Sequence, residues 1–306
     1  MADCLVIGGA GFLGSRVAAA LVERGHNVAS FDRYSRGVPN DDSVRPIVGE
    51  FLDTAALRAA VRGQQQVYHF LSSTTPATVQ DDPALDLATN VRGAIDLFSI
   101  AADEGVERIA FASSGGAIYG DQAVTPITED AAPRPVSPYA IGKLTIESYL
   151  RYFERTRGLR SVSFRISNPY GPQQRSANKQ GVIPIFLRAI AAGRPVTVFG
   201  DGSMVRDYLY VDDAAAMVAA TAALDPHHDI YNIGSGHGTS LAELLELAGK
   251  VTGRRIAVEH VAQPPTFVDR SVVDPSRFLG EFGIAPRVAL VDGMTSTWTA
   301  IEAAAR

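Results

Sequence analysis

Short apolar runs alternate with helix-like stretches along the first half of the chain, and this order restricts the fold more than any other feature. Helical periodicity separates most of the runs, beginning with Phe12 to Val22 directly after the first one. Such an alternation predicts an α/β fold with a parallel sheet and helices on both of its faces. The runs expected to form strands are Cys4–Ile7, Val28–Phe31, Pro46–Val48, Val67–Leu71, Ile109–Ala112 and Val162–Ile166.

The pattern changes after about residue 168. Glycines and prolines are frequent between Gly171 and Gly202, so the strands there should be short and irregular. A helix over Asp213–Leu224 and a strand over Ile230–Ile233 then predict that the chain returns to the main sheet.

The rest of the chain predicts a smaller second lobe that packs against the first part. Ser240 followed by Glu243 is the pattern of a capped helix start, and the proline-rich tail should form loops closed by a last helix from about Leu290. We expect a sheet domain over 1–168, with 208–235 returning to it, and a smaller C-terminal substrate-binding lobe over 169–207 and 236–306.

The composition narrows the possible partners. The 28 basic and 33 acidic residues leave a net charge of −5, so the overall charge does not favour nucleic acid or an anionic membrane as a partner. Cys4 is the only cysteine, which excludes a disulfide framework and suits a reducing compartment, so we expect a cytoplasmic protein. Neither a membrane segment nor a metal site is expected, because no apolar run is long enough and His227 and His228 lack partners at ligand spacing.

A glycine-rich segment joins the first predicted strand to the first predicted helix. Gly8 permits a sharp turn, Gly11 leaves space for a pyrophosphate, and Gly14 lets the helix pack on the strand. The helix that opens with Phe12 and Leu13 directs its first N–H groups toward the phosphates. In this position the segment predicts a Rossmann-type, doubly wound domain that binds a dinucleotide.

Asp32 lies at the end of the second predicted strand, 18 residues after Gly14. A carboxylate there can bind both hydroxyls of an adenosine ribose and repels a 2′-phosphate, which favours NAD over NADP. Arg33 and Arg36 are near enough to weaken this preference, unless they are solvated loop charges. We therefore expect NAD as the cofactor, bound by the domain of residues 1–168.

Tyr139 and Lys143 form the pair that points to catalysis. With 10 tyrosines and three lysines in the chain, about 0.1 pairs at this spacing are expected by chance. Ser137 as a helix cap and Pro138 at the first helical position would place both side chains on one helix face. An ammonium beside a phenol lowers the pKa of the phenol, so Tyr139 is a candidate general acid or base.

Together these motifs resemble the extended short-chain dehydrogenases, and more narrowly the nucleotide-sugar epimerase/dehydratase family with its UDP-glucose 4-epimerase branch. The segment Ser113 to Gly120 (SSGGAIYG) follows the fifth predicted strand as it does in that family. Arg165 to Gly171 (RISNPYG) and Arg206 to Asp213 (RDYLYVDD) match the family pattern in order and spacing. The resemblance extends over essentially the whole chain.

The resemblance implies epimerisation at carbon 4 of a nucleotide-linked hexose, such as UDP-glucose or UDP-galactose. Tyr139 would take the proton of the sugar 4-hydroxyl while the hydride passes to the nicotinamide, and Lys143 would hold the cofactor ribose. The 4-keto sugar would turn over before the hydride returns, so NAD ends unchanged. Relatives also suggest a homodimer through the helices that contain Asn90–Ala101 and Tyr139–Tyr152, although core burial explains their apolar stripes equally well.

The resemblance also assigns residues to the site. Asn168 and Arg206 would contact the diphosphate, with Arg270 as a further candidate, and an ion pair with Asp207 or Asp212 is the alternative for Arg206. The residues expected around the cofactor are Gly8, Gly11, Phe12, Leu13, Gly14, Asp32, Glu50, Phe51, Phe70, Leu71, Ser72, Asn90, Ser113, Tyr139, Lys143 and Ile166. Those expected around the substrate are Ser114, Tyr139, Asn168, Val182, Val198, Phe199, Arg206 and Arg270.

One departure from the family concerns its third catalytic residue. This chain has Gly115 where the family places a serine or threonine, so Ser114 becomes the candidate for the hydrogen bond to the sugar 4-oxygen, with Ser113 as the alternative. The 4,6-dehydratases of the family carry an Asp–Glu pair at the next two positions, which here hold Gly116 and Ala117. Dehydration therefore lacks its acid and base.

Two other functions are compatible with the motifs. One is an NADPH-dependent reductase of a nucleotide-linked 4-keto-6-deoxysugar, which uses the same tyrosine and lysine. The other is a non-catalytic protein that senses a dinucleotide; Gly115 slightly favours it, whereas Tyr139 and Lys143 count against it. Asp32 and the RISNPYG segment favour the epimerase over the reductase.

Overall fold

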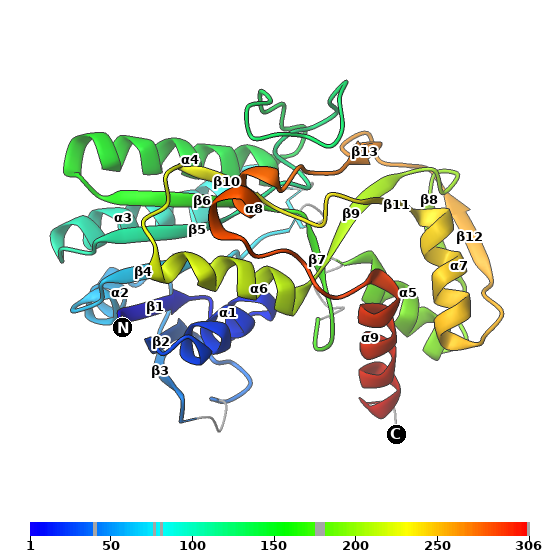
Figure 1. Cartoon of the computed structure of the whole chain (residues 1–306), viewed down its shortest axis with the longest axis horizontal. Helices are drawn as coiled ribbons and strands as arrows, with labels where there is room; N and C mark the ends of the chain where they lie inside the picture. The colour runs from blue at the N-terminus through cyan, green and yellow to red at the C-terminus, as the bar shows by residue number, and fades with distance from the viewer. Residues whose placement is uncertain (39–41, 76–77, 80–81, 175–180, 305–306) are drawn as a thin grey trace.

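The computed structural model of the chain describes residues 1–38, 42–75, 78–79, 82–174 and 181–304. Its largest sheet has seven parallel strands in the order β3-β2-β1-β4-β5-β6-β10 and fills the left half of Figure 1. The predicted Rossmann-type α/β fold is therefore confirmed. The strands are β1 (Asp3–Ile7), β2 (Asn27–Asp32), β3 (Val44–Val48), β4 (Gln66–His69), β5 (Arg108–Ser114), β6 (Arg160–Ile166) and β10 (Ile230–Ile233).

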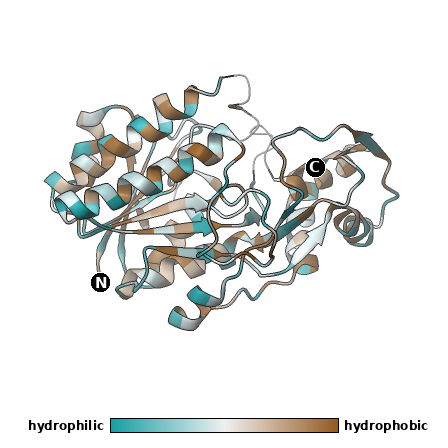
Figure 2. Ribbon diagram, turned by 90° about the horizontal axis from the view of Figure 1, so that it is seen from above, coloured by the Kyte–Doolittle hydropathy of each residue, from teal (hydrophilic) through white to brown (hydrophobic). Residues whose placement is uncertain are grey.

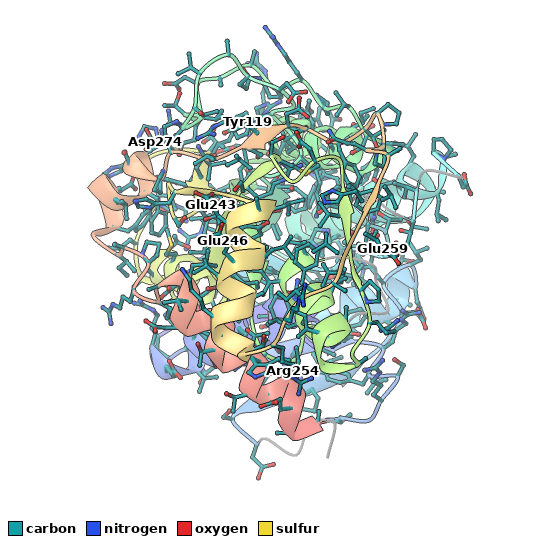
Figure 3. All side chains as sticks on the ribbon, turned by 90° about the vertical axis from the view of Figure 1, so that its right-hand side faces the viewer. Tyr119, Glu243, Glu246, Arg254, Glu259 and Asp274 are labelled. Carbon is teal, nitrogen blue, oxygen red and sulfur yellow. The ribbon has the colours of Figure 1, made fainter. Side chains whose placement is uncertain are left out.

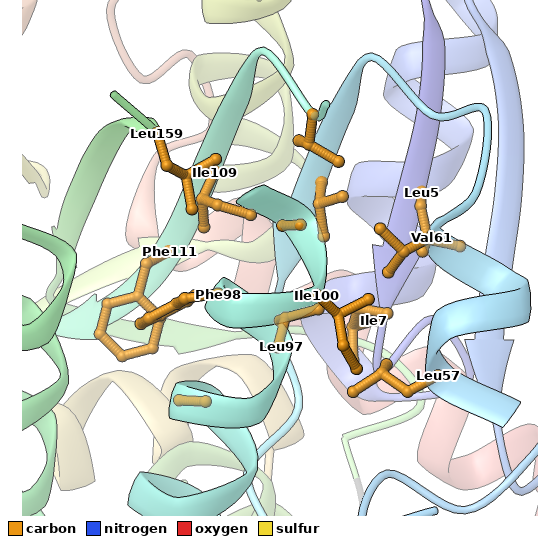
Figure 4. Packing of buried hydrophobic residues seen from close by; sticks show 14 of the residues in the cluster. Leu5, Ile7, Leu57, Val61, Leu97, Phe98, Ile100, Ile109, Phe111 and Leu159 are labelled. Carbon is orange, nitrogen blue, oxygen red and sulfur yellow. The ribbon is translucent and has the colours of Figure 1, made fainter. Parts of the chain in front are cut away.

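The central strands are buried on both faces, which is why they read as continuous apolar runs. Side chains alternate along a strand, so Leu5 and Ile7 of β1 enter one core while Cys4 and Val6 enter the other. Figure 4 shows the first core, where helix side chains such as Leu97 lie against the sheet. That core is covered by α2 (Thr54–Val61), α3 (Arg92–Asp103) and α4 (Pro138–Arg157), and the second by α1 (Phe12–Glu23) and α6 (Val211–Ala220). Seen from above, polar and apolar residues alternate along the helices (Figure 2).

The strand order reverses beside β1, which pairs with β2 on one side and with β4 on the other. Doubly wound folds bind ligands in the crevice at the carboxyl ends of such strands. β4 ends at His69, before the predicted end at Leu71, because β1 ends at Ile7, the register partner of His69. Beyond this point Phe70 and Leu71 leave the sheet and pass close to Gly8.

In its described residues the second lobe, at the right of Figure 1, contains two small sheets covered by three helices. In one sheet β9 lies between β11 and β13 and also pairs with β7; in the other β8 pairs with β12. The strands are β7 (Asn168–Tyr170), β8 (Val196–Phe199), β9 (Val205–Tyr210), β11 (Gly238–Ser240), β12 (Val258–Val261) and β13 (Arg270–Ser271). The helices are α5 (Val182–Ala191), α7 (Leu241–Thr252) and α9 (Leu290–Ala304).

Local sequence signals explain the ends of α7. The predicted capping box is present, because the Ser240 hydroxyl accepts from the Glu243 N–H while the Glu243 carboxylate accepts from the Ser240 N–H. Figure 3 shows Glu243 and Glu246 on the outer side of the helix. Just past its end, the Arg254 guanidinium lies 5.0 Å from the centroid of the Trp298 ring of α9.

The tail differs from the predicted loop-rich cap, because it contains the helix α8 (Ser276–Phe282). The Phe278 and Phe282 rings stack with centroids 4.6 Å apart, and both pack edge-on against Tyr231 of β10. These contacts attach α8 to the main sheet rather than to the lobe expected over 236–306. No helix within the described ranges combines the length and the apolarity needed to cross a membrane.

Candidate active site

A cavity of about 1250 Å³ extends from the turn after β1, past the carboxyl ends of β4, β5 and β6, to the second lobe. It lies where the strand order reverses, the usual ligand site of this fold. The predicted cofactor residues that line it are Gly8, Gly11, Phe12, Leu13, Asp32, Glu50, Phe51, Phe70, Leu71, Ser72, Ser113, Tyr139, Lys143 and Ile166. The predicted substrate residues that line it are Ser114, Tyr139, Asn168, Val182, Phe199 and Arg206.

The turn after β1 has the geometry that a dinucleotide requires. Gly8 has a φ of +86°, and a Cβ on it would lie 2.6 Å from the backbone nitrogen of Leu71, so no larger residue fits. Gly14 lies outside the cavity lining; a Cβ there would lie 2.2 Å from the Gly8 carbonyl oxygen, in keeping with a packing role. Gly11 caps α1 without a side-chain hydrogen bond, which leaves N–H groups of the first turn for a phosphate.

Asp32 is held beside this turn by two backbone hydrogen bonds. Its Oδ2 accepts from the Ala10 N–H at 3.1 Å and its Oδ1 from the Arg33 N–H at 2.7 Å. The carboxylate borders the cavity where it fits the hydroxyls of an adenosine ribose, and Arg33 and Arg36 line the same end. The glycine turn, the open helix N-terminus and this carboxylate together fit NAD.

α4 brings the catalytic candidates to the carboxyl end of β5. As predicted, the Ser137 hydroxyl caps the helix and Pro138 is its first residue. The Lys143 Nζ donates a hydrogen bond to the Ala112 carbonyl at 2.8 Å and lies 5.7 Å from the centroid of the Tyr139 ring. Both side chains line the cavity one helical turn apart.

The two serines that end β5 have different partners. The Ser113 Oγ donates to the buried Glu147 carboxylate at 2.6 Å. Ser114 instead lines the cavity together with Tyr139, and its hydroxyl opposes the rise in the pKa of the Tyr139 phenol. Of the two serines, the structure therefore favours Ser114 as the hydroxyl that acts beside the phenol, because the hydroxyl of Ser113 is already engaged.

Close packing explains the glycine at the position of the usual serine or threonine. A Cβ on Gly115 would lie 2.7 Å from the Arg165 carbonyl oxygen and 2.8 Å from the Val273 Cγ1. A larger residue would have to displace the backbone of β6 at this point. The chain thus carries its candidate hydroxyl one position earlier, on Ser114.

The electrostatics of the protein alone differ from the prediction. Burial raises the pKa of Tyr139 to about 12; the charge of Asp86 adds to the rise, and the hydrogen bond with Ser114 opposes it. Burial lowers the pKa of Lys143 to about 8, against the effects of Asp86 and Glu147. The prediction that the ammonium lowers the pKa of the phenol is therefore wrong for the protein alone, because desolvation of the phenol dominates.

The far end of the cavity holds the predicted diphosphate contacts. The Asn168 Nδ2 donates to the Asp207 carbonyl at 3.0 Å, and Arg206 donates to the Val205 carbonyl at 2.8 Å. Within the described ranges no carboxylate forms an ion pair with Arg206, and Asp207 and Asp212 have other partners. Burial lowers the pKa of this guanidinium, although the charges of Asp121 and Asp269 oppose the fall. Because no carboxylate pairs with it directly, the guanidinium is open to an anionic ligand.

Three more predicted site residues lie outside the cavity lining. Val198 is fully buried in the lobe core, because the alternation along β8 directs Thr197 and Phe199 into the cavity instead. Arg270 is exposed on β13, where its Nε donates to a threonine hydroxyl at 3.0 Å. Asn90 is buried and is not part of the cavity lining, so its contact with the cofactor stays a prediction.

A buried polar network behind the cavity wall was not predicted. The Asn90 Nδ2 donates to the Thr74 Oγ1 at 2.7 Å and to the Asp86 Oδ1 at 2.8 Å, and the Thr74 hydroxyl also donates to Asp86. Asn90 belongs to the π-helix η1 (Leu87–Val91), an irregularity frequent at functional sites. Asp86 and Asn90 are only four residues apart, but Thr74 comes from the loop after β4, and local periodicity does not predict that this loop contacts them.

Two further hydroxyls of the cavity lining were also missed. Those of Ser167 and Tyr208 are buried and have no hydrogen-bond partner in the described part of the chain. They lie inside the RISNPYG and RDYLYVDD segments, which were already singled out and could have identified them.

The fold and the cavity together define a Rossmann-fold protein that can hold a dinucleotide beside a tyrosine and a lysine. The sequence pattern of the NAD dependent epimerase/dehydratase family matches residues 4–234. The chain belongs to this family and is one of its NAD-dependent enzymes.

Three known proteins are similar to this chain over nearly its whole length. A UDP-glucose 4-epimerase of Mycolicibacterium smegmatis is 33% identical over 304 residues, 96% of each chain. A dTDP-4-dehydro-6-deoxyglucose reductase of Escherichia coli is 32% identical over 304 residues, 95% of this chain and 94% of the relative. The crystal structure of a UDP-glucose 4-epimerase of Thermotoga maritima with UDP-glucose superposes with a TM-score of 0.92 at 32% identity, over 99% of each chain.

Proposed function

We propose that this protein is an NAD-dependent epimerase that inverts carbon 4 of a nucleotide-linked hexose of the UDP-glucose and UDP-galactose type. The observation that carries the proposal is that the Ser114 and Tyr139 hydroxyls and the Lys143 amine line one cavity, which Asp32 also borders. Two hydroxyls at one point can bind a sugar hydroxyl and move its proton. The similar UDP-glucose 4-epimerases support the same activity.

Each polar group around the phenol has its own role in this proposal. As a phenolate, Tyr139 takes the proton of the sugar 4-hydroxyl and becomes a neutral phenol, which later returns the proton to the inverted oxygen. Ser114 donates a hydrogen bond to that oxygen. Lys143, held on the Ala112 carbonyl, places its positive charge beside the phenol when the proton leaves. NAD, when bound, supplies the hydride acceptor and donor at carbon 4.

The two lobes divide the binding in this proposal. Residues 1–168 and 208–235 bind NAD, whereas 169–207 and 236–306, apart from α8, bind the nucleotide sugar. Arg206 forms no ion pair with a carboxylate among the described residues and suits a diphosphate, because a guanidinium donates to phosphate oxygens without giving up its charge. Firm binding of the nucleotide at this end leaves the hexose free to turn near the phenol.

The test is incubation of the purified protein with a panel of UDP- and dTDP-linked hexoses without added cofactor, followed by proton NMR of the anomeric signals. We expect UDP-galactose and UDP-glucose to interconvert. A protein that carries NAD and leaves every sugar of the panel unchanged would contradict the proposal.

A reductase is the second candidate, because one relative is a dTDP-4-dehydro-6-deoxyglucose reductase. Such an enzyme consumes a reduced cofactor, and Arg33 and Arg36 at the adenosine end could accept the 2′-phosphate of NADPH. Asp32 opposes that phosphate. Loss of NADPH absorbance on addition of a nucleotide-linked 4-keto-6-deoxysugar, with no sugar converted in its absence, would favour the reductase.

We also propose a homodimer that forms through α4. Ile141, Tyr149 and Tyr152 expose 48%, 37% and 56% of their surface on this helix, which is unusual for large apolar side chains. The Tyr149 and Tyr152 rings pack edge-on, 6.5 Å apart. Sedimentation equilibrium should give twice the chain mass, and Tyr152→Glu should give the single chain mass.

A further inference from the structure

Asp86 is a buried carboxylate to which the proposed mechanism gives no role. It lies directly before η1, and only 2% of its surface is exposed. Its Oδ1 accepts hydrogen bonds from the Thr74 hydroxyl and from the Asn90 amide. Within the described ranges no arginine, lysine or histidine forms an ion pair with it. A buried charge without such a partner is costly, so its position calls for a physical reason.

The second oxygen of Asp86 rests against the catalytic helix. A Cβ on Gly142 would lie 1.7 Å from the Asp86 Oδ2, so only glycine allows this approach. Glycine inside a helix is destabilising relative to alanine, so its presence here calls for a reason. Gly142 lies in the turn that joins Tyr139 to Lys143, and the carboxylate therefore faces the helix between the two candidates.

None of the other groups described around Lys143 carries a negative charge that is not already paired with a cation. Glu147 is engaged by Arg165, with the Nη2 and Oε2 atoms 2.8 Å apart, and by a serine hydroxyl. His69 on β4 stays neutral, because burial and the charge of Lys143 lower its pKa to about 3. Tyr139 is a neutral phenol, and the Ala112 carbonyl contributes only a dipole. Asp86 is thus the acidic neighbour of Lys143 whose charge is not already balanced by a cation.

We propose that Asp86 is a positioning residue: seated on Gly142, its carboxylate supplies the negative charge that keeps the buried Lys143 amine protonated beside Tyr139. The catalytic consequence of a protonated Lys143 rests on the proposed function. The physical claim concerns the charge of Lys143 and stands apart from any particular substrate. Burial lowers the pKa of this amine. The charges of Asp86 and Glu147 oppose the fall, and the effect of Asp86 is the larger.

The test is the pH dependence of amine labelling in the whole protein with Asp86→Asn. Asparagine can accept the same hydrogen bonds from Thr74 and Asn90, so the variant removes the charge and keeps the shape. Acetic anhydride reacts only with neutral amines, and mass spectrometry of the Lys143 peptide over a range of pH gives the pKa. Exposed Lys250 is the internal reference. We expect the pKa of Lys143 to fall by about one unit or more.

Two further variants make the outcome decisive. Asp96→Asn removes an equal charge on the surface of α3 and should leave the pKa of Lys143 unchanged. Gly142→Ala pushes the carboxylate away from α4 and should lower the pKa in the same direction as Asp86→Asn. If Asp86→Asn does not fold, Gly142→Ala decides the question. An unchanged pKa of Lys143 in the folded variants overturns the proposal.

Failure of this inference is distinguishable from failure of the proposed function, because labelling needs no turnover. If the protein is an epimerase, the alkaline limb of its pH–rate profile should also move to lower pH in Asp86→Asn, whereas a purely structural role would lower the rate equally at every pH.

Discussion

The Arg165 guanidinium and the Glu147 carboxylate form a buried ion pair between β6 and α4, with Nη2 and Oε2 2.8 Å apart and Nε and Oε1 3.1 Å apart. The same carboxylate accepts from Ser113 on β5, and the guanidinium lies 4.8 Å from the centroid of the Tyr119 ring. This pair therefore fixes the helix that carries Tyr139 against the two strands that border the cavity.

Removal of one member of this pair should destabilise the fold. Arg165→Met leaves a buried, uncompensated carboxylate, which costs about 3 to 5 kcal/mol in the free energy of unfolding. The double variant with Glu147→Leu should recover most of that loss, because it removes both charges of the pair. Urea denaturation measures both effects; a double variant less stable than Arg165→Met would contradict this account.

Tyr139→Phe should abolish turnover while the cofactor still binds. The loss of a general acid–base group costs about 10²- to 10⁴-fold in rate, whereas the glycine turn and Asp32 are untouched. Tyr149→Phe, on the exposed face of the same helix, is the matched control and should keep full activity. Biological activity that persists in Tyr139→Phe with bound NAD would instead favour the dinucleotide sensor.

The two serines of β5 should separate catalysis from stability. Ser114→Ala removes the hydroxyl that lines the cavity with Tyr139 and should lower kcat by about 10²-fold or more at nearly unchanged stability. Ser113→Ala removes a donor from buried Glu147 and should cost about 1 to 3 kcal/mol of stability with a smaller effect on kcat. Steady-state kinetics and thermal denaturation check the pair, and a reversed pattern would assign the catalytic hydroxyl to Ser113.

The two arginines assigned to the diphosphate should behave differently. Arg206→Gln should raise KM by about tenfold or more with little change in kcat, because a charge-assisted hydrogen bond to the nucleotide is lost. Arg270→Gln should leave KM unchanged, because Arg270 is exposed outside the cavity lining. An equal rise of KM in both variants would return Arg270 to the site.

The stability of the protein should fall in mild acid because of His69. This side chain lies between the rings of Phe51 and Phe111, at centroid distances of 5.2 and 5.5 Å, and its ring nitrogens have no partner among the described residues. Burial lowers its pKa from 6.5 in the unfolded chain to about 3 in the fold. Between about pH 6.5 and pH 3 the imidazole is therefore protonated in the unfolded chain but neutral in the fold. The free energy of unfolding decreases as the pH falls through this range.

The variant His69→Phe should remove this dependence. We expect it to gain stability over the parent protein at about pH 5 and to differ less at about pH 8, where both states hold the imidazole neutral. Urea denaturation at the two pH values measures the difference. A stability difference that is equal at both would show that His69 does not titrate in this range.

Structural elements that depend only on residues close together in the chain could be predicted from the sequence. The strand, glycine turn and helix from Cys4 to Val22 are encoded by local patterning, and the spacing of Tyr139 and Lys143 places both on one helix face whatever surrounds them. The sequence also shows a glycine, Gly115, where the family has a serine or threonine. The aromatic pattern of α8 was present too, but its contact with Tyr231 joins segments far apart in the chain.

The amino-acid sequence by itself determined the order of strands and helices, the glycine turn, the acidic end of the second strand and the tyrosine–lysine spacing, because these follow from local periodicity and chain stereochemistry. Tertiary structure alone decided that Ser113 donates a hydrogen bond to Glu147, that Val198 is buried in the core of the second lobe and that the Asp86 carboxylate packs against Gly142. It also reversed the expected effect on the pKa of Tyr139. Burial and contacts between distant segments set these properties, and both arise only when the chain is packed.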